Sequence, residues 1–396
     1  MSPQKRPYKL CVIASHPIQY QAPLWQRMAQ DPDLDVTVYY CSSSGVSPTT
    51  KDSGFGVSYV WDIPLFDGYR HVFLTNLAVG SAASFLRLIN PSLVTEIVRN
   101  PWDGVLVTGW GSFSHCISIL ISALSGRRVF LFGDSSSRTP VPSFRRVIKS
   151  LLLPLAFRLV SGFMVTGAFN REFYIQYKVP IRRLFPFPMS IDNARFSVVL
   201  GTQERNDLRR KWGVAPDLPL VLFSGKLIDI KRPMDLLVAK SRVPQGCFGV
   251  VFAGDGVLRD QLMQFVEEQQ LRDVVFLGFV NQKELPSVYA ACDVLCLPSE
   301  RDARGLVVNE AMACGLPVVV SSGTGVWGPG DLVRHGENGF VVEVGDTSTL
   351  ANYLNTIAVD PAFRARASAK SREIIAKWTY DECVVGLKQA LATCVR

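Results

Sequence analysis

Two acidic residues at the start of a predicted helix form the first candidate site. Asp302 and Glu310 lie eight positions apart, in a polar loop and in the helix that follows it. Helical side chains lean toward the N-terminus, so Glu310 shares a side with the loop. The first N–H groups of the helix can bind an anion or hydroxyl groups. This combination indicates a ligand with hydroxyls and phosphate, such as a nucleotide sugar; the alternative is a solvated loop with a helix-capping charge.

A predicted β-α-β unit positions these residues. Apolar runs at Val294–Leu297 and Val318–Ser321 predict buried strands on either side of a helix from about Gly305 to Cys314. Strands joined in this way are parallel, and parallel sheets bind ligands at the carboxyl ends of their strands. The loop Ser299–Gly305 lies at that end, which supports the interpretation as a ligand site.

Two lysines follow another predicted strand. Leu220–Gly225 is followed by Lys226 and then by Lys231, just before a predicted helix near Met234–Ala239. Fixed cations in such a loop can bind the phosphate of the ligand considered above without a metal ion. The alternative is that both lysines are solvated in a β-α loop.

The stretch around Asp302 resembles the signature of the retaining glycosyltransferase family 4, whose members have the GT-B fold. The residues that carry the resemblance include a Pro-Ser pair, a Gly-Leu-Val-Val run and a Glu-Ala-Met-Ala run: Pro298, Ser299, Gly305–Val308, Glu310–Ala313, Gly315, Pro317 and Val318. Lys226 and Lys231 are similar to the two cations of the family that bind the donor diphosphate. The resemblance is strong over about residues 218–352 and weak over residues 1–200.

This resemblance implies a role for each residue type. Glu310 is expected to hold the ribose of the donor, and Asp302 is expected to contact the donor sugar. The residues expected to act in catalysis are Asp302, Lys226, Lys231, His16 and His115. The residues expected to bind the donor are Gly225, Lys226, Lys231, Phe279, Val280, Asp302, Ala303, Arg304, Gly305, Leu306 and Glu310.

The sequence departs from the family pattern in both halves. The family has a glutamate where this chain has Asp302, which shortens the side chain by about 1.5 Å. A misplacement of roughly 1 Å can cost ~100-fold in rate. Glu300 is an alternative contact, although it breaks the spacing. The first half lacks the family's Gly-Gly loop and histidine, so His16 and His115 remain as candidates, either for substrate contact or as structural histidines.

The length and composition fit two globular domains. The chain has 396 residues, of which 48% are hydrophobic and 19% charged. We expect an α/β protein of the GT-B type, with two Rossmann-like domains whose parallel sheets face an interdomain cleft. Residues 1–193 would bind the acceptor, residues 194–374 the nucleotide-sugar donor, and residues 375–396 would form a helix that crosses back to the first domain. Residues 42–80 are expected to form loops. Further buried strands are expected at Arg128–Phe132 and Gly249–Ala253, and terminal helices at Arg372–Lys377 and Tyr380–Leu391.

Metal ligands and membrane-spanning segments are not expected. Nine scattered cysteines show no C-x-x-C spacing and are interpreted as reduced thiols of a cytosolic protein. Asp31, Asp33 and Asp35 have the spacing of a metal-binding Asp-x-Asp motif, but Pro32 and the position before a predicted strand favour a loop. Gly323-x-Gly325-x-x-Gly328 matches a dinucleotide fingerprint by letter, but Pro329 and Gly330 leave no helix for it. No apolar stretch reaches the ~18 residues of a membrane span.

Positive charge is concentrated in the first half. The net charge is +8, and residues 127–195 contain 12 basic and 3 acidic residues. This asymmetry suggests an anionic surface or acceptor as the partner, and no nucleic acid. The predicted helix Val141–Val160 contains four basic residues, Arg145, Arg146, Lys149 and Arg158. It could lie on anionic lipid, or it could be a core helix with solvated cations.

We therefore predict a retaining, metal-independent, hexosyltransferase-type enzyme without a cofactor. It would transfer a sugar from a UDP- or GDP-sugar to a glycan, a lipid-linked acceptor or another small molecule. It would work in the cytoplasm, peripherally at the inner face of the membrane. The alternative is a catalytically silent nucleotide-sugar-binding protein with a regulatory role.

Overall fold

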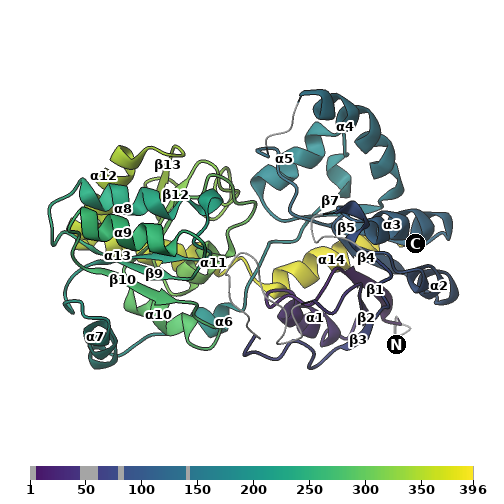
Figure 1. The fold of residues 1–396 in the computed structure, drawn as a ribbon. Helices are drawn as coiled ribbons and strands as arrows, with labels where there is room; N and C mark the ends of the chain where they lie inside the picture. The colour runs from purple at the N-terminus through teal and green to yellow at the C-terminus, as the bar shows by residue number, and fades with distance from the viewer. Residues whose placement is uncertain (1–5, 45–60, 79–83, 140–142, 396) are drawn as a thin grey trace. The chain divides into compact units, whose positions relative to one another are not determined.

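The structure is a computed structural model that describes residues 6–44, 61–78, 84–139 and 143–395. The chain divides into two compact units (Figure 1). Unit 1 comprises Met1–Thr50, Ile63–Met189 and Tyr380–Arg396, and unit 2 comprises Lys51–Asp62 and Ser190–Thr379. The predicted functional boundaries after residues 193 and 374 remain predictions.

Unit 1 is built on a seven-stranded sheet in the order β3-β2-β1-β4-β5-β6-β7, with every neighbouring pair parallel. Its strands are β1 (Tyr8–Ala14), β2 (Leu34–Tyr40), β3 (Arg70–Phe73), β4 (Gly104–Thr108), β5 (Arg128–Phe132), β6 (Gly162–Val165) and β7 (Leu184–Pro186). The strand order reverses between β1 and β4, and ligands of such sheets bind at the carboxyl ends beside this reversal.

Two apolar clusters form the core of unit 1, one on each face of its sheet, and helices contribute side chains to both. One cluster includes α1 (Ala22–Ala29) and α14 (Tyr380–Cys394), whose Leu387 and Leu391 are fully buried. The other includes residues of α2 (Ser92–Arg99), α3 (Phe113–Leu124), α4 (Ser143–Ala156) and α5 (Ala168–Gln176). At Gly386 of α14, an added Cβ would lie 1.7 Å from the carbonyl oxygen of Pro186. A glycine therefore lets α14 approach β7 closely.

Unit 2 is built on a six-stranded parallel sheet in the order β10-β9-β8-β11-β12-β13. The strands are β8 (Leu220–Ser224), β9 (Gly249–Ala253), β10 (Val274–Gly278), β11 (Val294–Leu297), β12 (Val318–Ser321) and β13 (Gly339–Val342). The order reverses between β8 and β11, which are central neighbours. The two sheets confirm the predicted parallel α/β class.

The helices of unit 2 alternate with its strands along most of the chain. They are α6 (Asn193–Phe196), α7 (Thr202–Lys211), α8 (Pro233–Ser241), α9 (Arg259–Glu268), α10 (Leu285–Ala291), α11 (Leu306–Ala313), α12 (Thr347–Val359) and α13 (Pro361–Ile375). Side chains of α8, α9 and α12 join β8, β9 and β11 in one buried apolar cluster.

Two local expectations were incomplete. Residues 42–80 were expected to be loops, but β3 lies in this range and pairs with β2. This edge strand is only four residues long and largely exposed, and it contains just two apolar residues, Val72 and Phe73. The helix predicted to begin at Arg372 begins at Pro361, where Asp360 caps it by accepting a hydrogen bond from the Phe363 N–H at 2.9 Å.

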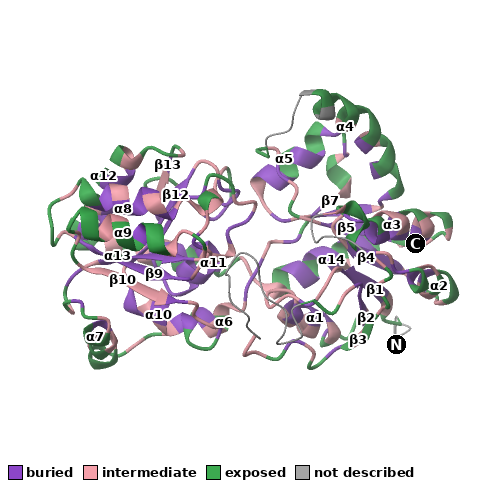
Figure 2. Cartoon of the chain, in the orientation of Figure 1, coloured by how far each residue is buried: buried purple, intermediate pink, exposed green. Residues whose placement is uncertain are grey.

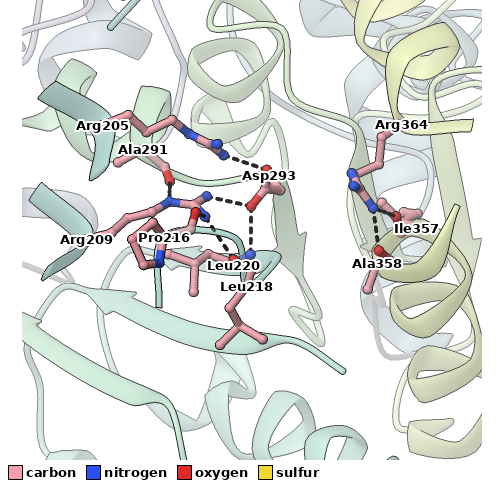
Figure 3. Close-up of polar contacts among 10 residues, drawn as sticks. All are labelled: Arg205, Arg209, Pro216, Leu218, Leu220, Ala291, Asp293, Ile357, Ala358 and Arg364. Carbon is pink, nitrogen blue, oxygen red and sulfur yellow. Dashed lines mark hydrogen bonds and ion pairs between the residues drawn. The ribbon is translucent and has the colours of Figure 1, made fainter. Parts of the chain in front are cut away.

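A buried arginine connects α7 to the central strands of unit 2 (Figure 3). Arg209 donates from Nε to the Ala291 carbonyl and from Nη1 to the carbonyls of Pro216 and Leu218, each at 2.8 Å. Its Nη2 lies 2.6 Å from Asp293, immediately before β11. Asp293 also pairs with Arg205 at 2.6 Å and accepts a hydrogen bond from the Leu220 N–H at 2.8 Å.

A similar contact occurs where α12 leads into α13. Arg364 donates to the last carbonyls of α12, those of Ile357 and Ala358 (Figure 3). These carbonyls have no partners within the helix, so the guanidinium satisfies them and holds the two helices together.

Replacing Arg209 tests this connection. Arg209→Met should lower the free energy of unfolding by about 3 kcal/mol, because it leaves buried carbonyls and Asp293 with fewer partners. Arg210→Met is the matched control on the same helix, since Arg210 forms an exposed pair with Asp207; its cost should stay below about 0.5 kcal/mol. Urea unfolding of both variants measures the difference, and equal costs would contradict the anchoring role.

Candidate functional site

The loop after β8 carries the first predicted lysine. Gly225 has a φ of +141°, a conformation that favours glycine. Its carbonyl oxygen would lie 1.8 Å from a Cβ added at Gly254, so the loops after β8 and β9 are in close contact. The Leu227 N–H also donates to the Asp255 carbonyl at 2.9 Å. Contacts of Gly225 and Leu227 with the loop after β9 thus fix the backbone on both sides of Lys226.

Lys231 and Asp302 form an ion pair. Lys231 ends the short 3₁₀ helix η4 (Asp229–Lys231), and Asp302 lies in the loop after β11. These residues are 71 positions apart in the sequence. They come together because β8 and β11 are neighbouring parallel strands whose carboxyl ends share one edge of the sheet. The residues predicted to bind the diphosphate and the donor sugar are therefore in direct contact.

The Asp302 carboxylate also organises the start of α11. Its Oδ1 accepts hydrogen bonds from the N–H groups of Gly305 at 2.8 Å and Arg304 at 3.3 Å. Gly305 has a φ of +31° and stands immediately before α11. One carboxylate oxygen thus binds the loop backbone, and the other binds Lys231.

The glycines after β12 support the same loop. A Cβ added at Gly323 would lie 2.0 Å from the Glu300 carbonyl oxygen, and one at Gly325 would lie 1.9 Å from that of Ala303. The Gly325 N–H donates to the Asp302 carbonyl at 2.7 Å. This part of the G-x-G-x-x-G match therefore serves backbone packing. The Glu300 side chain is exposed, and its N–H donates to the Ile230 carbonyl at 2.9 Å.

Glu310 is fully buried in α11. Its carboxylate accepts a hydrogen bond from the hydroxyl of Tyr289 at 2.6 Å. Tyr289 lies in α10, is itself fully buried, and was not among the predicted residues. A single tyrosine in an apolar helix gives no sequence signal for this contact, since 21 positions separate the partners.

The Arg304 side chain has structural partners. It pairs with Asp331 at 3.1 Å, donates to the Gly325 carbonyl at 2.7 Å, and lies 5.0 Å from the ring centroid of Trp378. Both Arg304 and Asp331 are buried. Its neighbours Ala303 and Leu306 are partly exposed, as are Phe279 and Val280 after β10. The strand order places these residues at the carboxyl edge of the same sheet as Lys226.

The two candidate histidines lie in unit 1. His16 follows β1, and its Nδ1 is 2.9 Å from the Ser15 hydroxyl. His115 is in the first turn of α3, with its Nδ1 3.0 Å from the Ser112 hydroxyl. β1 and β4 are parallel neighbours, so the two histidines follow strands that end at one edge. Burial, and then the charge of Arg87, lowers the pKa of each, that of His115 to about 4.

The aspartates of the Asp-x-Asp motif pair with cations. Lys388 of α14 lies 3.1 Å from Asp31 and 2.6 Å from Asp33, and Asp35 pairs with Arg70. Within residues 6–44, 61–78, 84–139 and 143–395, no group of three His, Cys, Asp or Glu side chains is arranged to hold a metal ion. Across these same ranges, no helix has the length and apolar character needed to cross a membrane.

The low pKa of His115 predicts an acid-dependent loss of stability. The folded state binds a proton only near pH 4, whereas the unfolded chain binds it near the ordinary value of 6.5. The contribution of the neutral His115 side chain to the free energy of unfolding is therefore complete above pH 6.5 and is lost as the pH falls toward 4. At pH 5 the loss should be about 2 kcal/mol relative to pH 7.

Urea unfolding at these two pH values of the wild type and of His115→Gln isolates this effect. The variant should lose less stability on acidification than the wild type does. Equal losses for wild type and His115→Gln would contradict the assignment.

Comparisons with known proteins agree with these features. A family profile described as "Glycosyl transferases group 1" matches residues 204–374. An uncharacterized glycosyltransferase of Methanocaldococcus jannaschii is 33% identical over 189 residues, which is 47% of this chain and 48% of that protein. A sulfoquinovosyl transferase of Arabidopsis thaliana is 32% identical over 308 residues, covering 74% of this chain and 56% of that protein. The chain spans about half the length of the curated relatives it matches.

Solved structures share the whole architecture. The crystal structure of Anabaena HepE in complex with UDP and glucose matches 98% of this chain and 100% of its own, with a TM-score of 0.71 at 20% identity. Likeness at this identity shows the fold, while the matched profile identifies the family of the matched segment. Residues 204–374 are therefore a group 1 glycosyl transferase segment, and the two parallel α/β units of the chain have the GT-B fold.

Proposed function

We propose that this protein transfers a sugar from a nucleotide-sugar donor to an acceptor hydroxyl, with retention at the anomeric carbon. The observation that carries the proposal is the ion pair between Lys231 and Asp302 at the carboxyl ends of β8 and β11. A cation suited to a diphosphate and a carboxylate suited to sugar hydroxyls are adjacent there. The relatives named as glycosyltransferases, and the HepE complexes with UDP and UDP-glucose, support this donor class.

Donor binding would exchange the partners of Lys231. The diphosphate carries more negative charge than one carboxylate, so it competes with Asp302 for the Lys231 ammonium group. An Asp302 oxygen released from Lys231 can then accept hydrogen bonds from sugar hydroxyls, while the other oxygen keeps the loop closed at Gly305. Lys226 would supply a second cation, and Glu310 would bind the ribose, in exchange for or beside the Tyr289 hydroxyl.

The transfer step needs no protein nucleophile in this proposal. The bond between the anomeric carbon and the diphosphate oxygen breaks as a bond to the acceptor oxygen forms on the same face of the sugar. The acceptor proton moves to the departing diphosphate, whose growing charge the two lysines stabilise. The donor sugar is expected to be a hexose linked to UDP or GDP.

The acceptor side of the proposal concerns unit 1. Its excess of basic residues favours a glycan or a lipid-linked acceptor that carries negative charge. His16 and His115 lie at the carboxyl edge of its sheet, where an acceptor would bind. We place the reaction in the cytoplasm, at the inner face of the membrane. The nine cysteines are thiols and not disulfides, in keeping with a reducing compartment.

Calorimetry with UDP-, GDP-, ADP- and CMP-sugars tests the donor class. One UDP- or GDP-sugar should bind, and slow hydrolysis of that donor in EDTA should show that the bond-breaking step proceeds without a metal ion. Binding without hydrolysis or transfer to any glycan or lipid acceptor would indicate a silent nucleotide-sugar-binding protein. Absence of binding to every donor would overturn the proposal.

Substitutions at the ion pair separate its two functions. Lys231→Gln should weaken nucleoside-diphosphate binding about 10- to 100-fold, because it removes charge-assisted hydrogen bonds worth roughly 1.5–3 kcal/mol. Asp302→Asn removes the competitor for Lys231, so nucleotide affinity should be kept or raised while turnover falls by about 100-fold. Lys283→Gln, an exposed lysine before α10, is the control for lost charge. Unchanged turnover in Asp302→Asn would remove Asp302 from the sugar site and make Glu300 the next candidate.

A further inference from the structure

Helix α4 presents an apolar stripe to solvent. Six large apolar side chains of this 14-residue helix are between 50% and 66% exposed: Phe144, Val147, Ile148, Leu151, Leu152 and Leu155. Their spacing places them on one side of the helix. Figure 2 shows α4 as exposed along most of its length. A surface helix normally turns such a stripe toward the core, so this arrangement is the reverse of the usual one.

The helix is attached to unit 1 through its other side. Leu153 is buried in the apolar cluster of α2, α3 and α5, as is Phe157 in the 3₁₀ turn that follows α4. Leu153 lies two residues from both Leu151 and Leu155, which places it on the opposite side of the helix. The exposed stripe is therefore a surface that remains after α4 has packed against its own unit.

The charged residues of the sequence segment that contains α4 all have one sign. Residues 135–171 contain six basic and no acidic residues: Arg138, Arg145, Arg146, Lys149, Arg158 and Arg171. Arg146 and Arg158 are exposed, and Lys149 extends over the ring of Trp110, 6.0 Å from its centroid. Long basic side chains beside an apolar stripe are the composition of helices that lie in a membrane interface.

We propose that α4 lies in the surface of an anionic lipid bilayer, with its apolar stripe among the acyl chains and its cations at the headgroups. Charge favours this occupant over a second copy of the chain, because two copies of the stripe would bring like charges together. Fourteen residues span only about 21 Å of helix, so α4 lies along the bilayer and does not cross it.

This inference deepens the acceptor side of the proposed function. A unit held at the bilayer surface would meet a lipid-linked acceptor without a search through solution. Vesicle binding requires neither donor nor turnover. A protein that binds vesicles but transfers no sugar, or the reverse, would therefore separate the two proposals.

Co-sedimentation of the full chain with vesicles of phosphatidylglycerol and phosphatidylcholine, or of phosphatidylcholine alone, tests the proposal. The anionic vesicles should bind the protein, and the neutral ones should bind it at least tenfold more weakly. Arg146→Gln with Lys149→Gln should weaken binding about 25-fold, since each cation contributes about fivefold. Because the stripe inserts, a measurable fraction should stay bound in 1 M salt, where charge attraction is screened.

Leu151→Gln with Leu155→Gln tests insertion directly. This variant should reduce vesicle binding about 100-fold and abolish the salt-resistant fraction. Val359→Gln with Val385→Gln, two helical positions that are each 61% exposed, is the matched control and should bind as the wild type does. Urea unfolding of both variants verifies that they fold.

Three outcomes would overturn the proposal. The first is equal absence of binding to both kinds of vesicle. The second is binding that salt removes completely and that Leu151→Gln with Leu155→Gln leaves unchanged, which would indicate a purely electrostatic contact. The third is a dimer in light scattering that the leucine variant dissociates while vesicles compete weakly, which would assign the stripe to a second copy of the chain.

Discussion

Unit 2 depends on one carboxylate at the amino ends of its central strands, away from the candidate site. Asp293 lies immediately before β11. It accepts a hydrogen bond from the Leu220 N–H and forms ion pairs with Arg205 and Arg209. It thereby fixes the starts of β8 and β11 beside each other. These strands end at Lys226 and at the loop that holds Asp302. The buried guanidinium of Arg209 binds backbone carbonyls and the Asp293 carboxylate at the amino ends of these strands. Contacts at the amino ends thus set the geometry at the carboxyl ends, where the candidate site lies.

The sequence predicted the elements whose signals are local. β5, β9, β11 and β12 were predicted at their observed bounds, because each is a continuous apolar run between polar loops. β3 was missed because an edge strand needs no such run, and the early start of α13 was missed because its capping residue follows a helix closely. The site followed the same rule. Asp302, Glu310 and the lysines carry signatures, whereas the Tyr289 contact and the Arg304–Asp331 pair arise from packing between segments distant in sequence.

The ion pair between Lys231 and Asp302 links two features that the sequence presents separately. A carboxylate one methylene shorter than the family's glutamate still reaches both the α11 backbone and Lys231. The short arm thus has a structural use, since it closes the loop at Gly305 and pairs with the ammonium group of Lys231. Ligand selectivity in such a site depends on how well an incoming anion replaces that internal partner.

The position of α14 has a consequence for the order in which the chain folds. Leu387 and Leu391 are core residues of unit 1, yet in the sequence all of Ser190–Thr379 separates them from the strands that they cover. A ribosome therefore completes unit 2 before it releases the last residues of the unit 1 core. Domains commonly fold from the N-terminal one onward during synthesis. During synthesis, one apolar face of the unit 1 sheet stays incompletely covered until α14 has been made. Unit 1, most of which is made first, is therefore the more vulnerable half of the protein during synthesis.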